Sequence, residues 1–411
     1  MARLRRARDR SSTHCRRAQY RRRRGMSQEV LAGLVGRTVD WLSKVENGRI
    51  EIDRLSVIRA VAEALDVAMG DLLGDPTLLD WSAESGHRTV AALRETLLDY
   101  RQISPFLAAT PTTEIPTVSQ LHAQVAQVWD AYQASRYGYV IAQLPGLIAT
   151  AQAATIGHDG DEQLRSFALL GLAYQAAATL LTKLGEADLA WIAAERGLQA
   201  AQRSGETVVI GSLFRSVTHA LLSTGRFAEA KQLTDATAAF LQPGLADATP
   251  EYLSVYGTLF LAGAMAAARD EDRATVRAYL AEADETAQRL GRDANHLWTA
   301  FGPTNVVIHR VATAMDLGDV QVAIDLGPRV DTSAMPTERR VRHAMETARA
   351  LSAWNRTDEA LAVLLDAEQT APEQVRHHAI SRQLVQTWIR RGRGKPSYQL
   401  AALAHRVHVT R

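Results

Sequence analysis

The sequence has few of the residues that mark a secreted, metal-dependent or membrane protein. Its 411 residues include one cysteine, Cys15, which excludes a disulfide framework and a thiolate metal site. No apolar run reaches the roughly eighteen residues needed to span a bilayer. The motifs HExxH, paired CxxC and GxSxG are absent, and GRGKPS at 392–397 lacks the first glycine of a phosphate-binding loop. We therefore expect no catalytic residue, metal or cofactor, no membrane partner, and a cytoplasmic protein.

Net charge is also small, at +2, but the charges are segregated along the chain. Residues 1–75 sum to +6 and residues 376–411 to +8, which leaves about −12 for the middle when both are subtracted from +2. Residues 1–25 hold eleven arginines and one acid, Asp9, a composition that buries too little apolar surface to fold alone. Two interpretations stay open: a basic arm that binds the backbone of DNA, or a start site that replaces a natural first helix.

Residues 27–48, SQEVLAGLVGRTVDWLSKVENG, predict two short helices joined by a turn. Ser27 and Thr38 can each cap a helix, and Gly36 allows a sharp turn between them. We expect Asn47–Gly48 to end the second helix in the left-handed conformation. The apolar side chains predicted to face inward are Val30, Leu31, Leu34, Val35, Leu42 and Val45.

This segment resembles the lambda/Cro-like, or XRE, helix-turn-helix family. The family motif has Ser-Gln before the second helix, glycine at the turn and Glu-Asn-Gly at the close, which here are Ser27–Gln28, Gly36 and Glu46–Asn47–Gly48. The resemblance runs from about Arg21 to Leu73 and implies a domain of five short helices that reads the major groove. It also implies that Arg21 and Glu46 form a buried structural pair.

The same resemblance implies which side chains contact double-stranded DNA. Gln28, Asn47 and Arg49 would contact phosphates, while the residues that would face base edges are Thr38, Val39, Asp40, Ser43 and Lys44. Lys44 could donate to guanine O6 and N7, and Val39 could pack on a thymine methyl group. Asp40 could accept from cytosine N4, or it could only stabilise the helix N-terminus through the helix dipole.

From about residue 77 the chain is rich in alanine and leucine, and short turns break it at intervals. Four turns are followed by an alanine that would lie where two antiparallel helices approach closely: Ala190, Ala230, Ala323 and Ala360. Weaker copies end at Ala142 and Ala274. The pattern resembles a divergent tetratricopeptide array of about six helical hairpins over residues 118–390, and a generic helical bundle is the alternative. Candidate residues for lining its groove are Asn295, His296, Trp298 and Asn305.

The predicted fold class is thus all-α, with a small lambda-repressor-like domain followed by a tetratricopeptide-like α-solenoid. We expect a basic arm at 1–19, the helix-turn-helix domain at 20–75, a connecting helix and linker at 76–117 and the array at 118–411. This organisation resembles two-part bacterial regulators, including the peptide-sensing RRNPP group. It implies a transcriptional regulator that binds an operator as a homodimer and senses a peptide, small molecule or protein through the array. The alternative is a scaffold that binds a protein partner, with weak or lost DNA binding.

Overall fold

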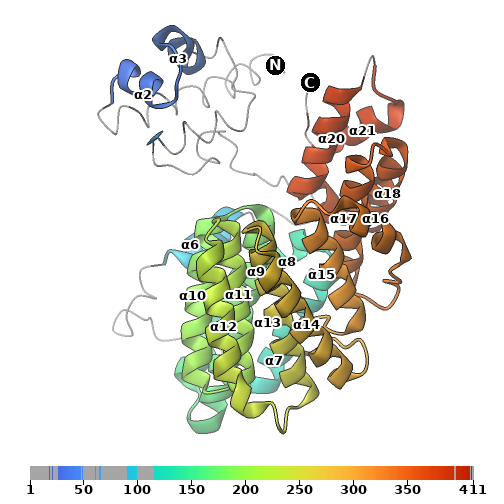
Figure 1. Cartoon of the computed structure of the whole chain (residues 1–411). Coiled ribbons are helices and arrows are strands. Elements are labelled where there is room, and N and C mark those ends of the chain that lie inside the picture. Colours follow the sequence, from blue (N-terminus) through green and yellow to red (C-terminus); the bar gives the residue numbers. More distant parts are fainter. Residues whose placement is uncertain are drawn as a thin grey trace. The chain divides into compact units, whose positions relative to one another are not determined.

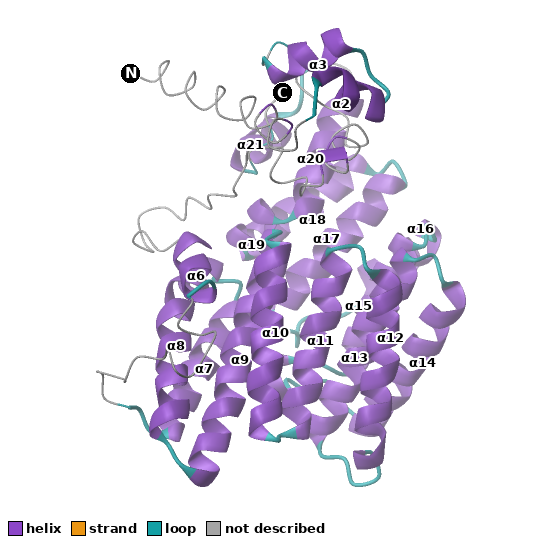
Figure 2. Ribbon diagram, turned by 90° about the vertical axis from the view of Figure 1, so that its left-hand side faces the viewer, coloured by secondary structure: helices purple, strands orange, loops and turns teal. Residues whose placement is uncertain are grey.

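The computed structural model describes residues 18, 21, 26–47, 49, 61, 64–65, 90–99, 115–392, 395–407 and 409. The chain divides into two compact units, Met1–Leu78 and Leu79–Arg411. Every regular element within the described ranges is a helix (Figure 2), which confirms the all-α fold class. The connecting helix and linker predicted at 76–117 lie mostly outside those ranges. The prediction of five helices in the first unit also falls largely on residues outside them.

The first unit contains α2 (Gln28–Leu34) and α3 (Val39–Glu46), the helix pair predicted from the sequence. The Ser27 hydroxyl accepts a hydrogen bond of 3.2 Å from the Val30 N–H, and the Thr38 hydroxyl accepts one of 3.2 Å from the Trp41 N–H. Gly36 lies between the helices at φ +63°, a conformation that a side chain would disfavour. Both predicted caps and the predicted turn glycine are therefore confirmed.

Two of the predicted inward positions on α2 are wrong. Val30 and Leu34 are 51% and 60% exposed, whereas Leu31 and Ala32 are buried with Leu42. A buried stripe on a helix follows spacings of three and four residues, and here it runs through Leu31, Ala32 and the half-buried Val35. Val30 and Leu34, four residues apart, share the neighbouring face instead.

The prediction that Asn47–Gly48 ends α3 in the left-handed conformation is tested only at Asn47. Asn47 has φ −91° and is not left-handed, and Gly48 lies outside the described residues. The Arg49 N–H donates to the Lys44 carbonyl oxygen at 2.8 Å. A bond of this span is the one that closes a Schellman motif, and it lies just after the last helical residue, Glu46.

The second unit stacks six antiparallel helix pairs (Figure 1). These pairs are α7 (Val118–Gln133) with α8 (Tyr137–Gly157), α9 (Gly160–Leu184) with α10 (Ala187–Ser204), α11 (Thr207–Ser223) with α12 (Phe227–Leu241), α13 (Pro250–Arg269) with α14 (Arg273–Leu290), α15 (Pro303–Asp316) with α16 (Val320–Leu326), and α17 (Thr337–Ala353) with α18 (Thr357–Thr370). Before them lies α6 (Val90–Leu97), and after them lie α19 (Pro372–His377), α20 (Ala379–Arg391) and α21 (Tyr398–Arg406).

The six turns inside these pairs share one geometry. Each contains a residue with positive φ, namely Ser135, Gly185, Gly225, Glu271, Gly318 and Asn355. Five residues after each of them lies a buried small or β-branched residue: Val140, Ala190, Ala230, Val276, Ala323 and Ala360. The four strong alanine positions are confirmed as points of close helix contact. Ala142 and Ala274 are wrong as repeat positions because valine occupies the equivalent site, and Ala274 is exposed.

Two helices are long and apolar enough, by length and composition, to cross a membrane, which the sequence analysis did not expect. They are α8 and α9, whose most apolar windows are 50% and 83% buried inside the unit. Both helices contribute to the largest hydrophobic core, for example through Ile141 and Leu180. Their apolar character is therefore accounted for by packing between neighbouring helices.

The array also makes contacts between its first pair and the helix that follows its last pair. The Ser135 hydroxyl donates to Gln374 Oε1 at 2.7 Å, and the Gly138 N–H donates to Glu373 Oε2 at 2.9 Å. These contacts join the turn between α7 and α8 to α19, more than 230 residues later in the chain. The array thus curls until its two ends meet.

Candidate nucleic-acid interface and ligand cavity

The five side chains predicted to face base edges lie at the start and along the outer side of α3. Thr38, Val39 and Asp40 are exposed, while Ser43 and Lys44 are half-buried. The inward side of the helix is formed by Leu42 and Val45, which are buried. Because α3 is amphipathic in this sense, its outer side is free to meet a partner without disturbing the core.

Two of these residues pair with each other. Lys44 Nζ lies 2.6 Å from Asp40 Oδ2, one helical turn away, and both side chains are solvent-accessible. Exposed pairs of this kind contribute at most about 1 kcal/mol, whereas a good bidentate contact with a base discriminates by about 1–3 kcal/mol. Opening the pair to contact bases is therefore energetically feasible.

Arg21 and Glu46 form a bidentate ion pair at the other end of α3. Arg21 Nε lies 2.7 Å from Glu46 Oε1, and Nη2 lies 2.8 Å from Oε2. The two side chains are only 9% and 5% exposed. The hydrogen bond to Glu46 raises the pKa of Arg21 above its ordinary value. Arg21 also donates to the Met26 carbonyl oxygen at 2.8 Å, so the pair links the last turn of α3 to the chain that enters α2.

The residues predicted to contact phosphates have partners of their own in this structure, or are exposed. Gln28 Nε2 donates to Glu46 Oε2 at 2.7 Å, which leaves its second amide hydrogen and its Oε1 for another partner. Asn47 Nδ2 lies 3.3 Å from Ser43 Oγ, and Arg49 is exposed. Gln28 therefore contributes to the Arg21–Glu46 pair, in addition to the phosphate role predicted for it.

Sequence reasoning missed Arg37, which directly precedes the cap of α3. Its guanidinium carbon lies 5.6 Å from the centroid of the Trp41 ring, a distance at which a cation is attracted to an aromatic face. This contact holds an exposed cation beside the outer side of α3. The available signal was the spacing of an arginine and a tryptophan four residues apart across the helix start.

The second unit contains a cavity of about 420 Å³. The first helix of each of the six pairs contributes to its wall, for example through Lys183 of α9, Arg215 of α11 and Arg342 of α17. Among the residues predicted to line a groove, only Trp298 lines this cavity. Asn295 instead pairs with Gln133, and His296 with Glu251. Asn305 is 1% exposed on α15, so it packs inside that helix layer.

Comparison with known proteins gives a family match within the first unit and a distant structural similarity. Residues 2–74 match a family model described as a helix-turn-helix domain. No curated protein matches the sequence. Among solved structures, the chain shows a distant similarity to Bacillus thuringiensis PlcR in complex with the peptide PapR7 and DNA. The TM-score is 0.37 and the identity 10%, over 86% of this chain and 99% of that one.

The first unit is therefore a helix-turn-helix domain, the class of DNA-binding unit that its caps, turn glycine and α3 indicate. The second unit is a tetratricopeptide-like array, as its six equivalent helix pairs define. The matched family describes a DNA-binding domain, and the match covers residues 2–74 within the first unit.

Proposed function

We propose that this protein is a cytoplasmic transcriptional regulator that binds a specific operator in double-stranded DNA as a homodimer. The observation that carries the proposal is the outer side of α3, where the five predicted base-reading side chains are exposed or half-buried while the Arg21–Glu46 pair fixes the opposite end of the helix. A reading helix needs this combination of a fixed backbone and unobstructed side chains.

Dimerisation follows from how little one such helix can read. A single α3 spans eight residues, and its few side chains reach only a few base pairs. Two copies bound to half-sites about one helical turn of DNA apart multiply the specificity. We assign the dimer interface to the array, and light scattering on a fragment without residues 1–76 should then still report a dimer. A monomeric fragment would rule out that interface.

The array is also proposed as the sensor of a signal. Its cavity is lined by the first helix of each of the six pairs, so a molecule bound there could contact all six pairs at once. A ligand can change the separation of two DNA readers only if it binds one dimer geometry more tightly than another. A cavity shared by all the pairs is a suitable place for that difference, because its shape depends on the curvature of the whole array.

The experiment that tests DNA reading is selection of bound sequences from random duplex DNA near physiological salt. Full-length protein is compared with a Thr38→Ala/Lys44→Ala variant, which keeps every arginine of residues 1–25. Enrichment of a palindrome by the full-length protein and its loss in the variant are expected. Equal, salt-sensitive binding by both proteins would mean that the arginines merely contact phosphates, and the scaffold alternative would then be favoured.

A further inference from the structure

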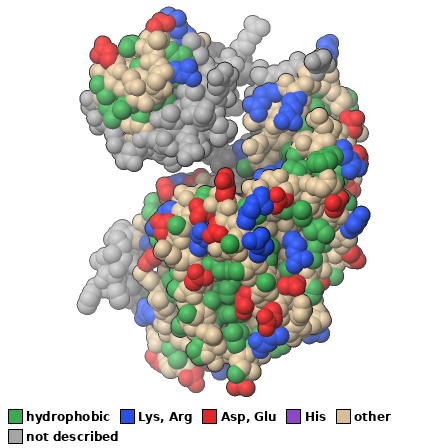
Figure 3. Space-filling model, viewed as in Figure 1, with side chains coloured by type: hydrophobic (Ala, Val, Ile, Leu, Met, Phe, Trp, Pro, Cys, Tyr) green, Lys and Arg blue, Asp and Glu red, His purple; other side chains and the backbone are tan. Residues whose placement is uncertain are grey.

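The cavity of the array has an excess of positive charge. Five cations contribute to its wall, Lys183, Arg215, Arg269, Arg339 and Arg342, against two carboxylates, Glu338 and Glu346. These cations come from α9, α11, α13 and α17. The excess is unexpected in a region of the chain whose net charge is negative, and whose visible outer face in Figure 3 carries acidic and basic side chains interspersed.

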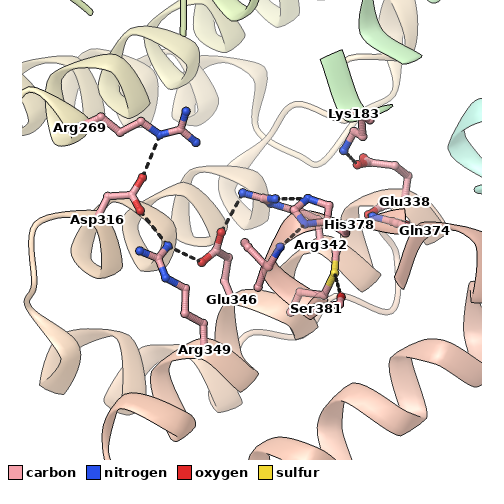
Figure 4. A network of polar contacts seen from close by, with 12 residues as sticks. Lys183, Arg269, Asp316, Glu338, Arg342, Glu346, Arg349, Gln374, His378 and Ser381 are labelled. Carbon is pink, nitrogen blue, oxygen red and sulfur yellow. Dashed lines mark hydrogen bonds and ion pairs between the residues drawn. The ribbon is translucent and has the colours of Figure 1, made fainter. Parts of the chain in front are cut away.

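Most of these cations are neutralised within a polar network. Figure 4 shows a chain of contacts from Arg269 through Asp316, Arg349 and Glu346 to Arg342, with distances of 2.8–3.3 Å between the ion-paired atoms. Lys183 is paired with Glu338. Although burial alone would raise it, the charges of Lys183 and Arg339 lower the pKa of Glu338 to about 2. Both carboxylates of the cavity therefore already form ion pairs with cations of the array.

Two arginines are left without full compensation. Arg215 makes no ion pair with any described residue, and its Nε is buried without a hydrogen-bond partner. Arg339 Nε is likewise buried without a hydrogen bond and lies 3.9 Å from Glu338. Burial, with a further contribution from Arg339, lowers the pKa of Arg215 to about 10. Both guanidinium groups therefore keep donor capacity inside the cavity that an anionic group could bind.

Another part of the cavity lining is apolar and aromatic. Trp129 of α7 and Trp298 stack with their ring centroids 5.5 Å apart and an angle of 9° between the rings, and Met265 and Ile308 also contribute. Trp298 belongs to the segment after α14, where Leu297, Trp298 and Ala300 all have positive φ. A positive φ strains the backbone of a residue other than glycine, and such strain tends to be retained at binding sites.

Cavity size limits what can bind. A volume of about 420 Å³ corresponds to roughly fourteen water molecules at ~30 Å³ each. It is within the range of small-molecule sites, which is about 300–1,000 Å³. A compact molecule therefore fits inside it.

We propose that this cavity binds a compact anionic ligand, a carboxylate or phosphate on an apolar or aromatic body, with Arg215 and Arg339 as the anion clamp. The anionic group lies between the two guanidinium groups, and the body packs against Trp129, Trp298, Met265 and Ile308. This assignment rests on the proposed function in that it names the ligand class for the array's sensing role. Its test is independent of DNA, so failure of one does not imply failure of the other.

The test measures thermal unfolding of full-length protein with four probes. The probes are indole-3-acetate, its neutral amide, phenyl phosphate and inorganic phosphate. Three proteins are compared: wild type, Arg215→Gln/Arg339→Gln, and the control Arg277→Gln/Arg292→Gln, which removes two exposed arginines outside the cavity. All three keep the arginines of residues 1–25, so anion binding there is the same in each.

A charged aromatic probe at one hundred times its dissociation constant should raise the unfolding temperature of wild type and control by about 5 °C. The neutral amide should not change it. The clamp variant should lose this gain while unfolding at the same or a higher temperature without probe, because it lacks Arg215, which has no ion pair with any described residue, and Arg339, whose ion pair with Glu338 spans 3.9 Å. A preference for indole-3-acetate over phenyl phosphate would identify the anion as carboxylate, and the reverse as phosphate. An equal response of clamp variant and wild type, a response to inorganic phosphate alone, or no response of wild type at millimolar probe would each overturn the proposal.

Discussion

The Arg21–Glu46 pair allows a quantitative prediction for the helix-turn-helix domain. Glu46 accepts three short hydrogen bonds, two from Arg21 and one from Gln28, at 2.7–2.8 Å. Glu46→Ala removes all three and leaves a guanidinium that is 9% exposed without its counter-charge. Removal of one partner from a buried pair costs about 3–5 kcal/mol. At about 0.05–0.15 kcal/mol per residue, a unit of 78 residues is stable by only about 4–12 kcal/mol, so the change threatens its folding.

Hydrogen exchange followed by mass spectrometry can measure this loss in the full-length protein. Amides of α2 and α3 should exchange a hundred-fold to several-thousand-fold faster in Glu46→Ala, since each ~1.4 kcal/mol is a factor of ten, while amides of the array stay unchanged. The matched control is Arg21→Met/Glu46→Leu, which removes both charges and should recover most of the protection. If protection of α3 in Glu46→Ala stays within about 0.5 kcal/mol of wild type, the pair does not hold the reading helix and the reasoning is wrong.

Three further predictions concern base reading, helix packing and pH. Lys44→Ala should weaken operator binding by about 1–3 kcal/mol and relax preference at one position of each half-site; an unchanged selected sequence would exclude Lys44 from base reading. Ala360→Leu should destabilise the array by about 1–3 kcal/mol, measured by chemical denaturation, because Ala360 has no exposed surface. The control Ala274→Leu should stay within about 0.5 kcal/mol of wild type. Equal effects of the two substitutions would contradict the assigned register of the repeats. Burial and the charge of Arg339 lower the pKa of His309 to about 3, so only the unfolded chain binds this proton between about pH 6.5 and 3. The free energy of unfolding should therefore fall by up to ~1.36 kcal/mol for each pH unit as the pH is lowered from about 6.5 to 3. A His309→Gln variant with the same pH dependence as wild type would refute this contribution.

Local signals predicted the elements whose cause is local. Ser27 and Thr38 act on amides three residues away, and Gly36 acts on its own dihedral angles, so their roles could be inferred from the sequence. The spacing of Asp40 and Lys44 likewise permits the ion pair that the structure contains. The strong alanines could be predicted because a glycine or asparagine turn precedes each of them.

Other features depend on which face of a helix is covered, and there the sequence was insufficient. Val30 and Leu34 form a plausible apolar stripe on a seven-residue helix, and only the packing around Leu31 and Ala32 decides against it. The cavity was beyond prediction because Trp129 and Arg342, which both line it, are separated by more than two hundred residues. Their proximity depends on the curvature accumulated over six helix pairs.

The contact between the first helix pair and α19 changes how the array should lose its structure. In an open stack of repeats each unit touches only its neighbours, so unfolding can begin at either end and proceed one repeat at a time. Here the turn before α8 is bonded to Glu373 and Gln374 of α19, so the first pair and the helix after the last pair support each other. Opening the ring requires simultaneous separation of segments that are remote in sequence, and this couples fraying at one terminus to fraying at the other. The array should consequently melt as one cooperative body, and removal of its last helices should loosen α7 and α8.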